Sequence, residues 1–158
     1  MDVVADADAK EVTTMAEFSA VAVQTVNPGE TIIFTENPVP CRCNKIRHRD
    51  DTGSFLLSGR GSCSNRGSVN YLVDFGANIA IPTGETVGPI SVALTIDGNT
   101  ISSSQMEVTP AAVEEYFNVS RAINVGIWNG CCESVSVRNT SSIPILVSNA
   151  NIIISPKG

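Results

Sequence analysis

Charge, aromatic side chains and histidine are all scarce in this sequence, and each shortage excludes a class of protein. Charged residues make up 16% of the 158 residues, which is too few for a coiled coil. Hydrophobic residues make up 42%, which is too many for a disordered chain. No run of about 18 apolar residues is present, so we expect no membrane insertion. The net charge of -6 gives no general attraction to phosphate backbones, so we expect no nucleic-acid partner.

The single histidine, His48, limits the catalysis that one chain can assemble. A Ser-His-Asp or Cys-His arrangement would have to use it, and the sequence marks neither a base within reach of a nucleophile nor an oxyanion hole. Glu114 and Glu115 are adjacent in the sequence, which does not resemble the paired carboxylates of a glycosidase. We therefore expect a protein that is not an enzyme, uses no cofactor and has no assigned catalytic or metal-binding residue.

Short apolar or alternating runs separated by turn residues fill most of the chain, a pattern typical of many short strands. Asp97 and Gly98 separate two such runs and indicate a hairpin, hence an antiparallel sheet. Strands do not alternate with helical stretches of about 10 to 15 residues, which excludes the parallel architectures. Thr109 and Pro110 predict one short helix over residues 110–116. The expected strands are residues 18–26, 31–34, 45–48, 54–58, 69–81, 90–96, 118–128, 134–139 and 145–154.

The first residues differ in composition from the rest of the chain. Residues 1–15 alternate small and acidic side chains with Val and Ala, and they contain no aromatic residue. Such a segment cannot pack a core alone, and the remaining length suits one domain with a single core. The sequence therefore predicts an N-terminal acidic arm over residues 1–17 and an all-β sandwich over residues 18–158.

Several runs resemble the tumour necrosis factor and complement globular-head superfamily, in the same order along the chain. FSAVAV at residues 18–23 and VNPGETIIF at residues 26–34 resemble its first strand pair, GSFLL at 53–57 resembles the strand entering the sandwich, and YLVDFGANI at 71–79 resembles its aromatic-rich central strand. ISVALTIDG at 90–98 and ILVSNANIII at 145–154 also fit. The resemblance implies a jelly-roll sandwich of about ten antiparallel strands that forms a homotrimer.

Three longer segments resemble small jelly-roll proteins of gut Firmicutes and their prophages, which are similar to the C-terminal heads of collagen-like spore-surface proteins. The segments are IAIPTGETVGPISVAL at 79–94, VTPAAVEEYFNVS at 108–120 and SVSVRNTS at 134–141. No Gly-X-Y tract precedes the head, and a collagen triple helix requires one. The resemblance thus implies a phage capsid decoration or head fibre on the virion exterior, attached to the capsid by its arm. The alternatives are a spore-coat or cell-surface filament subunit, or a module that binds surface glycans.

Five cysteines carry the most suggestive chemistry of the chain. Their Cys-x-Cys and Cys-Cys spacings depart from the separation of about two to four residues in zinc sites. Disulfides within or between subunits, reduced thiols and a structural metal all stay open, and an odd count leaves one cysteine unpaired within a subunit. The cysteines are Cys41, Cys43, Cys63, Cys131 and Cys132.

Basic side chains interrupt the acidic chain between residues 42 and 66. One interpretation is a recognition patch for phosphate, a glycan or an acidic capsid surface. The other is that these groups pair with Asp50, Asp51 and acids of a neighbouring subunit. Without interleaved aromatic residues the patch is a poor platform for nucleic-acid bases. The candidate patch residues are Arg42, Lys45, Arg47 and Arg49.

Aromatic residues dominate both core and interface burial, so they predict one or the other here. In the trimers that the sequence resembles, aromatic and aliphatic residues of the central strands face the threefold axis. The resemblance therefore implies Tyr71, Phe75 and Phe117 as candidate trimer-interface residues.

Overall fold

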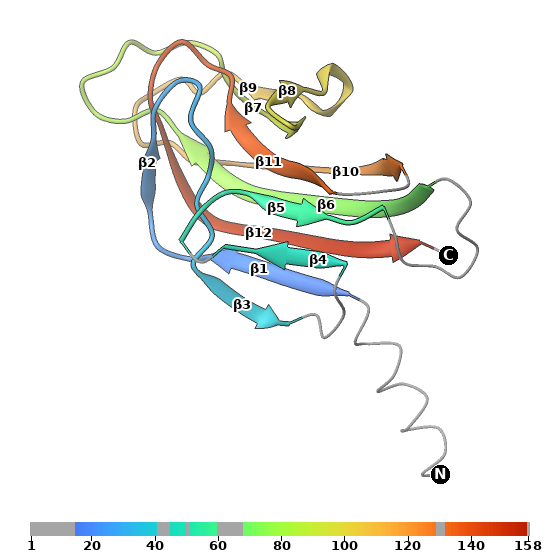
Figure 1. The fold of residues 1–158 in the computed structure, drawn as a ribbon. Coiled ribbons are helices and arrows are strands. Elements are labelled where there is room, and N and C mark those ends of the chain that lie inside the picture. The colour runs from blue at the N-terminus through green and yellow to red at the C-terminus, as the bar shows by residue number, and fades with distance from the viewer. Residues whose placement is uncertain (1–14, 41–44, 50, 60–67, 129–131, 158) are drawn as a thin grey trace, which may run out of the picture.

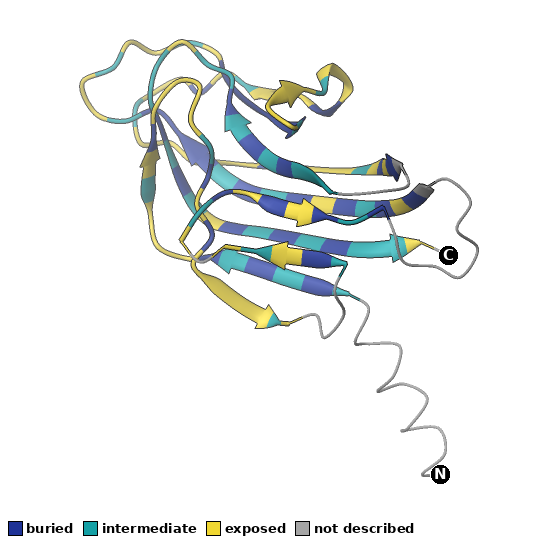
Figure 2. Ribbon diagram, in the orientation of Figure 1, coloured by how far each residue is buried: buried dark blue, intermediate teal, exposed yellow. Residues whose placement is uncertain are grey.

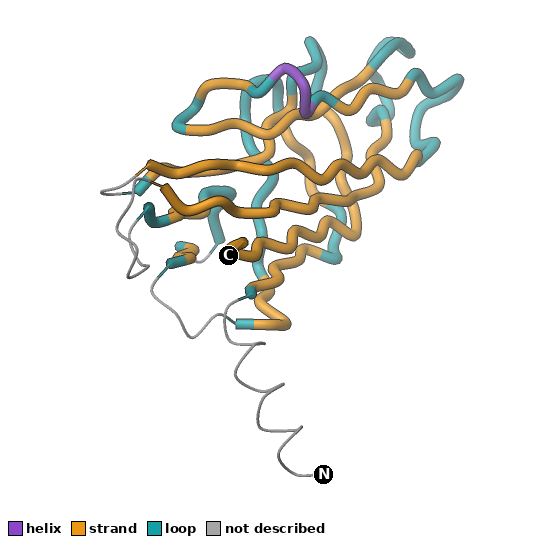
Figure 3. The backbone as a smooth tube through the Cα atoms, turned by 90° about the vertical axis from the view of Figure 1, so that its right-hand side faces the viewer, coloured by secondary structure: helices purple, strands orange, loops and turns teal. Residues whose placement is uncertain are grey.

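Two antiparallel sheets stacked face to face form the molecule (Figure 1). The structure, a computed structural model, describes residues 15–40, 45–49, 51–59, 68–128 and 132–157. Within these residues nearly every element is a strand, and the helical geometry is a single 3-10 turn, η1 (Ser102–Ser104) (Figure 3). The predicted all-β jelly-roll class is confirmed.

The first sheet, called the long sheet below, has the strand order β10-β6-β12-β1-β3, with β2 pairing the start of β12. Each pairing is antiparallel, and the central strand β12 lies between β6 and β1, which are far from each other in sequence. This order is the result of Greek-key connections, as expected for a jelly roll. Its strands are β1 (Ala16–Ala20), β2 (Gln24–Val26), β3 (Glu36–Val39), β6 (Ser68–Ala80), β10 (Phe117–Trp128) and β12 (Ile145–Lys157).

The second sheet, called the short sheet, has the order β4-β5-β11-β7-β8, with β9 pairing β7. Its hairpin between β7 and β8 turns at Asp97 and Gly98, whose φ angles are 51° and 84°. Two positive φ angles are what a type I′ turn requires, and Asp-Gly supplies them at low cost. The predicted hairpin is confirmed. The strands are β4 (Ile46–His48), β5 (Phe55–Leu57), β7 (Ile90–Ile96), β8 (Asn99–Thr100), β9 (Met106–Val108) and β11 (Glu133–Asn139).

The hydrophobic core lies between the two sheets and follows the period of two that strands impose (Figure 2). In β12, buried residues alternate with partly exposed ones over most of its length. Burying one such aliphatic or aromatic side chain contributes about 1.5 to 3 kcal/mol, so the alternation fixes which face of each strand turns inward. From the long sheet the core takes Val73, Phe75, Ile79, Ile152 and Ile154, all fully buried.

An aromatic cluster closes the core beside β4 and β5. Phe55 packs against Phe18 and Phe34, with ring centroids 4.8 and 5.3 Å apart. The His48 ring stacks on Phe55 at 4.5 Å and also contacts Phe18 at 4.9 Å. His48 therefore packs between the two sheets.

The helix predicted over residues 110–116 is wrong. Those residues form bends and turns, and Glu114 has a φ of 58°, which a right-handed helix cannot accommodate. The Glu114 amide donates to the Ile81 carbonyl, and the Ala111 amide donates to the Glu115 carboxylate. The bond to Ile81 takes the Glu114 amide, which a helix would have bonded to Pro110.

The segment predicted as a strand over residues 31–34 crosses between the sheets instead. The Ile32 amide donates to Val137 of the short sheet, whereas the Thr35 amide donates to Ser19 of the long sheet. The predicted strand over 18–26 is interrupted and forms β1 and β2. Ala16 and Glu17, which the sequence assigns to the arm, pair with β12 in β1, so the head begins before residue 18.

Candidate functional site

Four of the five cysteines lie outside the described residues. These are Cys41, Cys43, Cys63 and Cys131, so their pairing stays a prediction. Cys132 is partly buried at the entrance to β11. No group of three or more His, Cys, Asp or Glu side chains gathers as a metal site among the residues that the structure describes.

Tyr71 and Phe75 are fully buried inside their own chain. The Tyr71 hydroxyl donates to the Ser58 carbonyl at 2.6 Å, which links β6 to the segment after β5 across the sandwich. Neither side chain offers surface to a second subunit, which corrects their assignment to a trimer interface. Phe117, at the start of β10, is 38% exposed and keeps surface for a partner.

Burial raises the pKa of the Tyr71 phenol to about 12, from its ordinary value of 10.0, and charge on the Cys132 thiol adds to the rise. The native state keeps this proton up to about pH 12, whereas the unfolded chain loses it at about pH 10. The unfolded state then binds fewer protons, so the stability contributed by Tyr71 is complete below pH 10 and is lost as the pH rises to 12.

We expect Tyr71→Phe to lower the free energy of unfolding by about 1 kcal/mol near neutral pH, because it removes one hydrogen bond. That difference from the wild type is expected to narrow between pH 10 and pH 12, where only the wild type has the phenol to titrate. Urea unfolding of both proteins across this range measures it, and other titrating groups cancel in the comparison. A difference that stays constant with pH contradicts this role for Tyr71.

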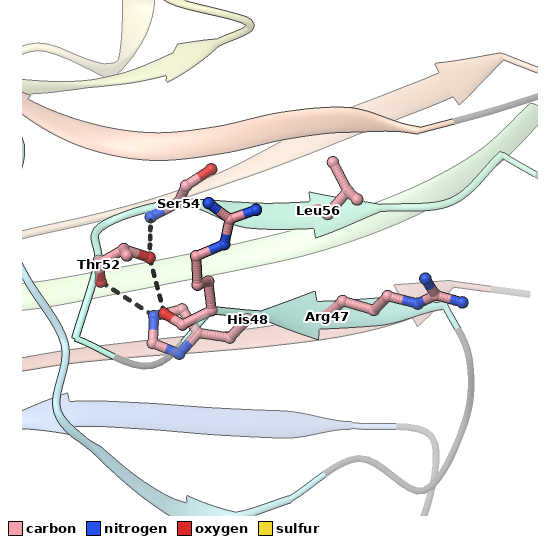
Figure 4. A pocket seen from close by; sticks show the side chains of 6 residues that line it. Arg47, His48, Thr52, Ser54 and Leu56 are labelled. Carbon is pink, nitrogen blue, oxygen red and sulfur yellow. Dashed lines mark hydrogen bonds between the residues drawn. The ribbon is translucent and has the colours of Figure 1, made fainter.

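The predicted basic patch divides between described and undescribed residues. Arg42 lies outside the described residues, and Lys45 is partly buried before β4. Arg47 in β4 and Arg49 just after it are both exposed, and both line a cavity of about 490 Å³ on the short sheet, where Figure 4 shows Arg47 with the other labelled lining residues. The structure therefore brings two of the four predicted patch residues together at one depression of the surface.

Four further residues complete the rim of this cavity. One is His48, between the two arginines, and sequence reasoning missed the other three. Leu56 lies opposite Arg47 in the β4-β5 ladder and is 37% exposed. Ser54 precedes β5 on the same outward face, and Thr52 lies in the turn between the strands. Ser54 and Leu56 could have been found from their spacing of two residues, which places both on one face of a strand. Arg47 and Arg49 have the same spacing, so a hairpin of β4 and β5 puts all four side chains on one face.

Hydrogen bonds fix the turn that carries this rim. The Thr52 carbonyl accepts from the Phe34 amide and from His48 Nε2, both at 3.0 Å, so Nε2 carries the hydrogen. The Thr52 hydroxyl donates to the Arg49 carbonyl at 2.7 Å. A Cβ on Gly53 would lie 2.3 Å from the Ile32 carbonyl oxygen, so only glycine fits there. These contacts hold Thr52 and Gly53 against Ile32, Phe34 and His48.

The outer face of the long sheet is a second candidate surface, where small and apolar side chains lie among a few charged ones. Alternation with the buried residues of β6 and β12 directs Leu72 and Ile153 outward, and both are partly buried. Gly76 and Ala122 lie in the neighbouring rows. Charged side chains border them: Asp74 lies between Ile153 and Ala122, Glu17 lies on the other side of Ile153, and Lys157 lies at the end of β12. The small and apolar side chains among these charges suit contact with another protein surface.

The two ends of the sandwich differ in character. β1 begins where β12 ends, since Ala16 pairs with Ile154, so the chain enters at the end marked C in Figure 1. The loops at the opposite end carry exposed aliphatic and aromatic side chains (Figure 2). These are Val21, Val23, Ile33, Val87 and Tyr116. The head thus presents an apolar loop surface away from its entry point.

Similarity to solved structures is confined to the fold. No protein-family model and no curated protein sequence matches the chain. The Eiger tumour necrosis factor of S. frugiperda superposes with a TM-score of 0.64 at 13% identity, over 91% of this chain and 92% of that one. The globular domain of zebrafish complement 1qA gives 0.60 at 10% identity, over 91% and 95%. The fold is that of tumour necrosis factor and complement 1q heads.

Murine APRIL, a further neighbour, superposes with a TM-score of 0.53 at 8% identity, over 89% of this chain and 98% of that one. All three comparisons span nearly the whole of both chains. The head therefore matches nearly the whole of a jelly roll of this type. The described residues offer two candidate surfaces: the cavity on the short sheet and the outer face of the long sheet. Among the described residues, no helix has the length and apolar character needed to cross a membrane.

Proposed function

We propose that this chain is a non-enzymatic structural protein whose heads associate into a homotrimer and display their loops on the surface of a larger assembly. The observation that carries the proposal is the outer face of the long sheet. In β6, β10 and β12 it combines small residues with partly buried Leu72 and Ile153. Packing this face against two copies would remove apolar surface from water, the main source of association free energy.

Charge on this face limits how the subunits can pack. Asp74 is exposed near the centre of β6, and an unpartnered carboxylate buried in an interface costs several kcal/mol. The trimer proposed here therefore leaves Asp74 at a solvated margin or beside a cation of the neighbouring subunit. Lys157, exposed at the end of β12 on the same face, is a cation of the right kind.

A closed, symmetric assembly would also limit pairing at the exposed edges of the long sheet. β10 and β3 are the edge strands of the long sheet, and exposed edges tend to pair with further chains. A ring of three copies closes on itself and does not propagate, so it yields a defined particle. Three identical arms then act on one assembly at high effective concentration, which turns weak tethers into firm attachment.

The assembly that we propose is a phage capsid, with the protein as a decoration or head fibre on the virion exterior. A spore coat or cell surface is the second candidate, favoured by the cysteine-rich segments that suit cross-linking. Support for an attached head comes from its polarity, since the chain enters at one end and the exposed apolar loops lie at the other. The arm would face the particle and the loops would face outward.

Deletion of residues 1–14 is expected to leave the head folded and trimeric but to abolish its attachment to the particle. The reason is that β1 starts at Ala16, so the deletion removes no strand of the head. Quantitative mass spectrometry of purified virions and purified spores, with the full chain and with the deletion, measures the occupancy. Full retention of the shortened chain contradicts the role of the arm, and presence on spores alone contradicts the virion.

A further inference from the structure

The cavity on the exposed face of the short sheet is built by two guanidinium groups, hydroxyl groups and one aliphatic side chain. Arg47 and Arg49 are two residues apart in extended backbone, so their Cα atoms are roughly 7 Å apart on one face. Leu56 lies across the β4-β5 ladder from Arg47, and Ser54 lies two residues before Leu56 on the same face of the sheet (Figure 4). Its volume of about 490 Å³ falls within the range of about 300 to 1,000 Å³ that is usual for small-ligand sites.

The positive charge of this cavity has no paired carboxylate among the residues that the structure describes. Across the described ranges no carboxylate pairs with Arg47 or Arg49, although the chain as a whole has a net charge of -6. Asp51, one of the acids expected to pair with them, is exposed in the turn and forms no ion pair with either, whereas Asp50 lies outside the described residues. Two neighbouring cations without a partner attract an anion, and guanidinium groups bind carboxylates through paired hydrogen bonds.

The apolar part of the rim narrows the class of anion. Leu56 is 37% exposed and faces the same space as the arginines. A pyranose ring has one face of C–H groups and several hydroxyl groups, which match Leu56 and Ser54. A free phosphate ion could accept a hydrogen bond from Ser54 but would gain nothing from Leu56. Base stacking is unavailable, because the one ring at the cavity, His48, is stacked on Phe55 and bonded to the Thr52 carbonyl.

The site is also preorganised. The turn that carries Arg49, Thr52 and Ser54 is fixed by its hydrogen bonds to Phe34 and His48 and by the close approach of Gly53 to Ile32. A ligand that binds here does not have to order Thr52 and Gly53, which removes one cost of association. The arginine side chains alone lose freedom on binding.

We propose that this cavity binds a carboxylated sugar, a hexuronic-acid unit of a surface polysaccharide, with Arg47 and Arg49 on the carboxylate and Leu56 under the ring. The inference deepens the proposed display function, because it names a ligand for the outward surface of the head. Binding of one sugar unit at one cavity does not require the trimer. Three copies would multiply avidity on a polymer that carries many such units.

Isothermal titration with a hexuronic-acid tetrasaccharide and with its carboxyl-reduced counterpart tests the proposal on the full-length protein. We expect the acidic sugar to bind and the reduced sugar to bind at least tenfold more weakly. Arg47→Ala and Arg49→Ala are each expected to weaken binding at least tenfold, and Arg47→Lys less than Arg47→Ala, since lysine keeps the charge but not the paired hydrogen bonds. Arg121→Ala is the matched control, because it removes one exposed charge from the other sheet.

Several outcomes would overturn the inference. Equal binding of the reduced sugar would remove the role of the carboxylate, and equal loss in Arg121→Ala would reduce the effect to overall charge. Inorganic phosphate or a sulfated oligosaccharide that binds as tightly, with no loss in Leu56→Ala, would make the cavity a plain anion site. A trimer that binds no sugar contradicts this inference alone, whereas a monomer that binds the acidic sugar contradicts the proposed trimer alone.

Discussion

Replacing Ile153 by aspartate is expected to convert the assembled head from three chains to one. Ile153 lies on β12, the central strand of the long sheet, and its side chain points away from the core between Glu17 and Asp74. A carboxylate at this position would be buried in the subunit contact beside the existing negative charges, which costs several kcal/mol per subunit. The expected mass in solution falls from about three times to one times the 16.6 kDa of the chain.

The matched control is Leu56→Asp, which places the same charge at a half-exposed aliphatic position on the outer face of the short sheet. We expect this variant to keep the mass of three chains. Circular dichroism establishes that both variants retain the β fold. An Ile153→Asp protein that stays folded and keeps the trimeric mass would show that the long sheet is not the subunit contact.

Phe55→Ala is expected to lower the free energy of unfolding by about 3 to 5 kcal/mol, the usual cost of removing a fully buried phenylalanine. Phe55 is fully buried and joins Phe18 and Phe34 to the ring of His48, so its loss leaves a cavity shared by both sheets. The turn at Thr52 would lose its packing as well. Chemical denaturation of the isolated protein gives the value directly.

Leu56→Ala provides the comparison for Phe55→Ala, because the two residues are adjacent in β5 and face opposite sides of the sheet. We expect Leu56→Ala to change the free energy of unfolding by about 0.5 kcal/mol or less, as surface substitutions usually do. Similar losses in the two variants would mean that β5 does not have the facing described here. The pair therefore tests the register of the β4-β5 hairpin.

Elements with strong local patterns could be predicted from the sequence. β7 has the bounds of the expected strand over residues 90–96, because its apolar run ends at the Asp97-Gly98 turn. β3 was missed, since Pro38 lies inside it and proline argues against a strand. The edge of a sheet tolerates proline, because an amide there needs no partner, but whether a strand lies at an edge is not a local property.

The same limit explains the outcome for the candidate site residues. Arg47 and Arg49 could be singled out by charge alone, whereas Ser54 and Leu56 became rim residues only through the pairing of β4 with β5. For Tyr71 and Phe75, aromatic character predicted burial but could not decide between the core and a subunit contact. To decide between them one must know which face of β6 turns toward the core. The alternation along β6 gives this only once the core is known.

Light scattering coupled to size exclusion, on the full-length protein under reducing conditions, tests the central claim most directly. The reductant removes any contribution of disulfides, so the mass reports on packing of the sheet faces alone. The account predicts a mass close to three times 16.6 kDa. A mass close to one chain would contradict it and leave a monomeric jelly roll with its cavity as the functional surface.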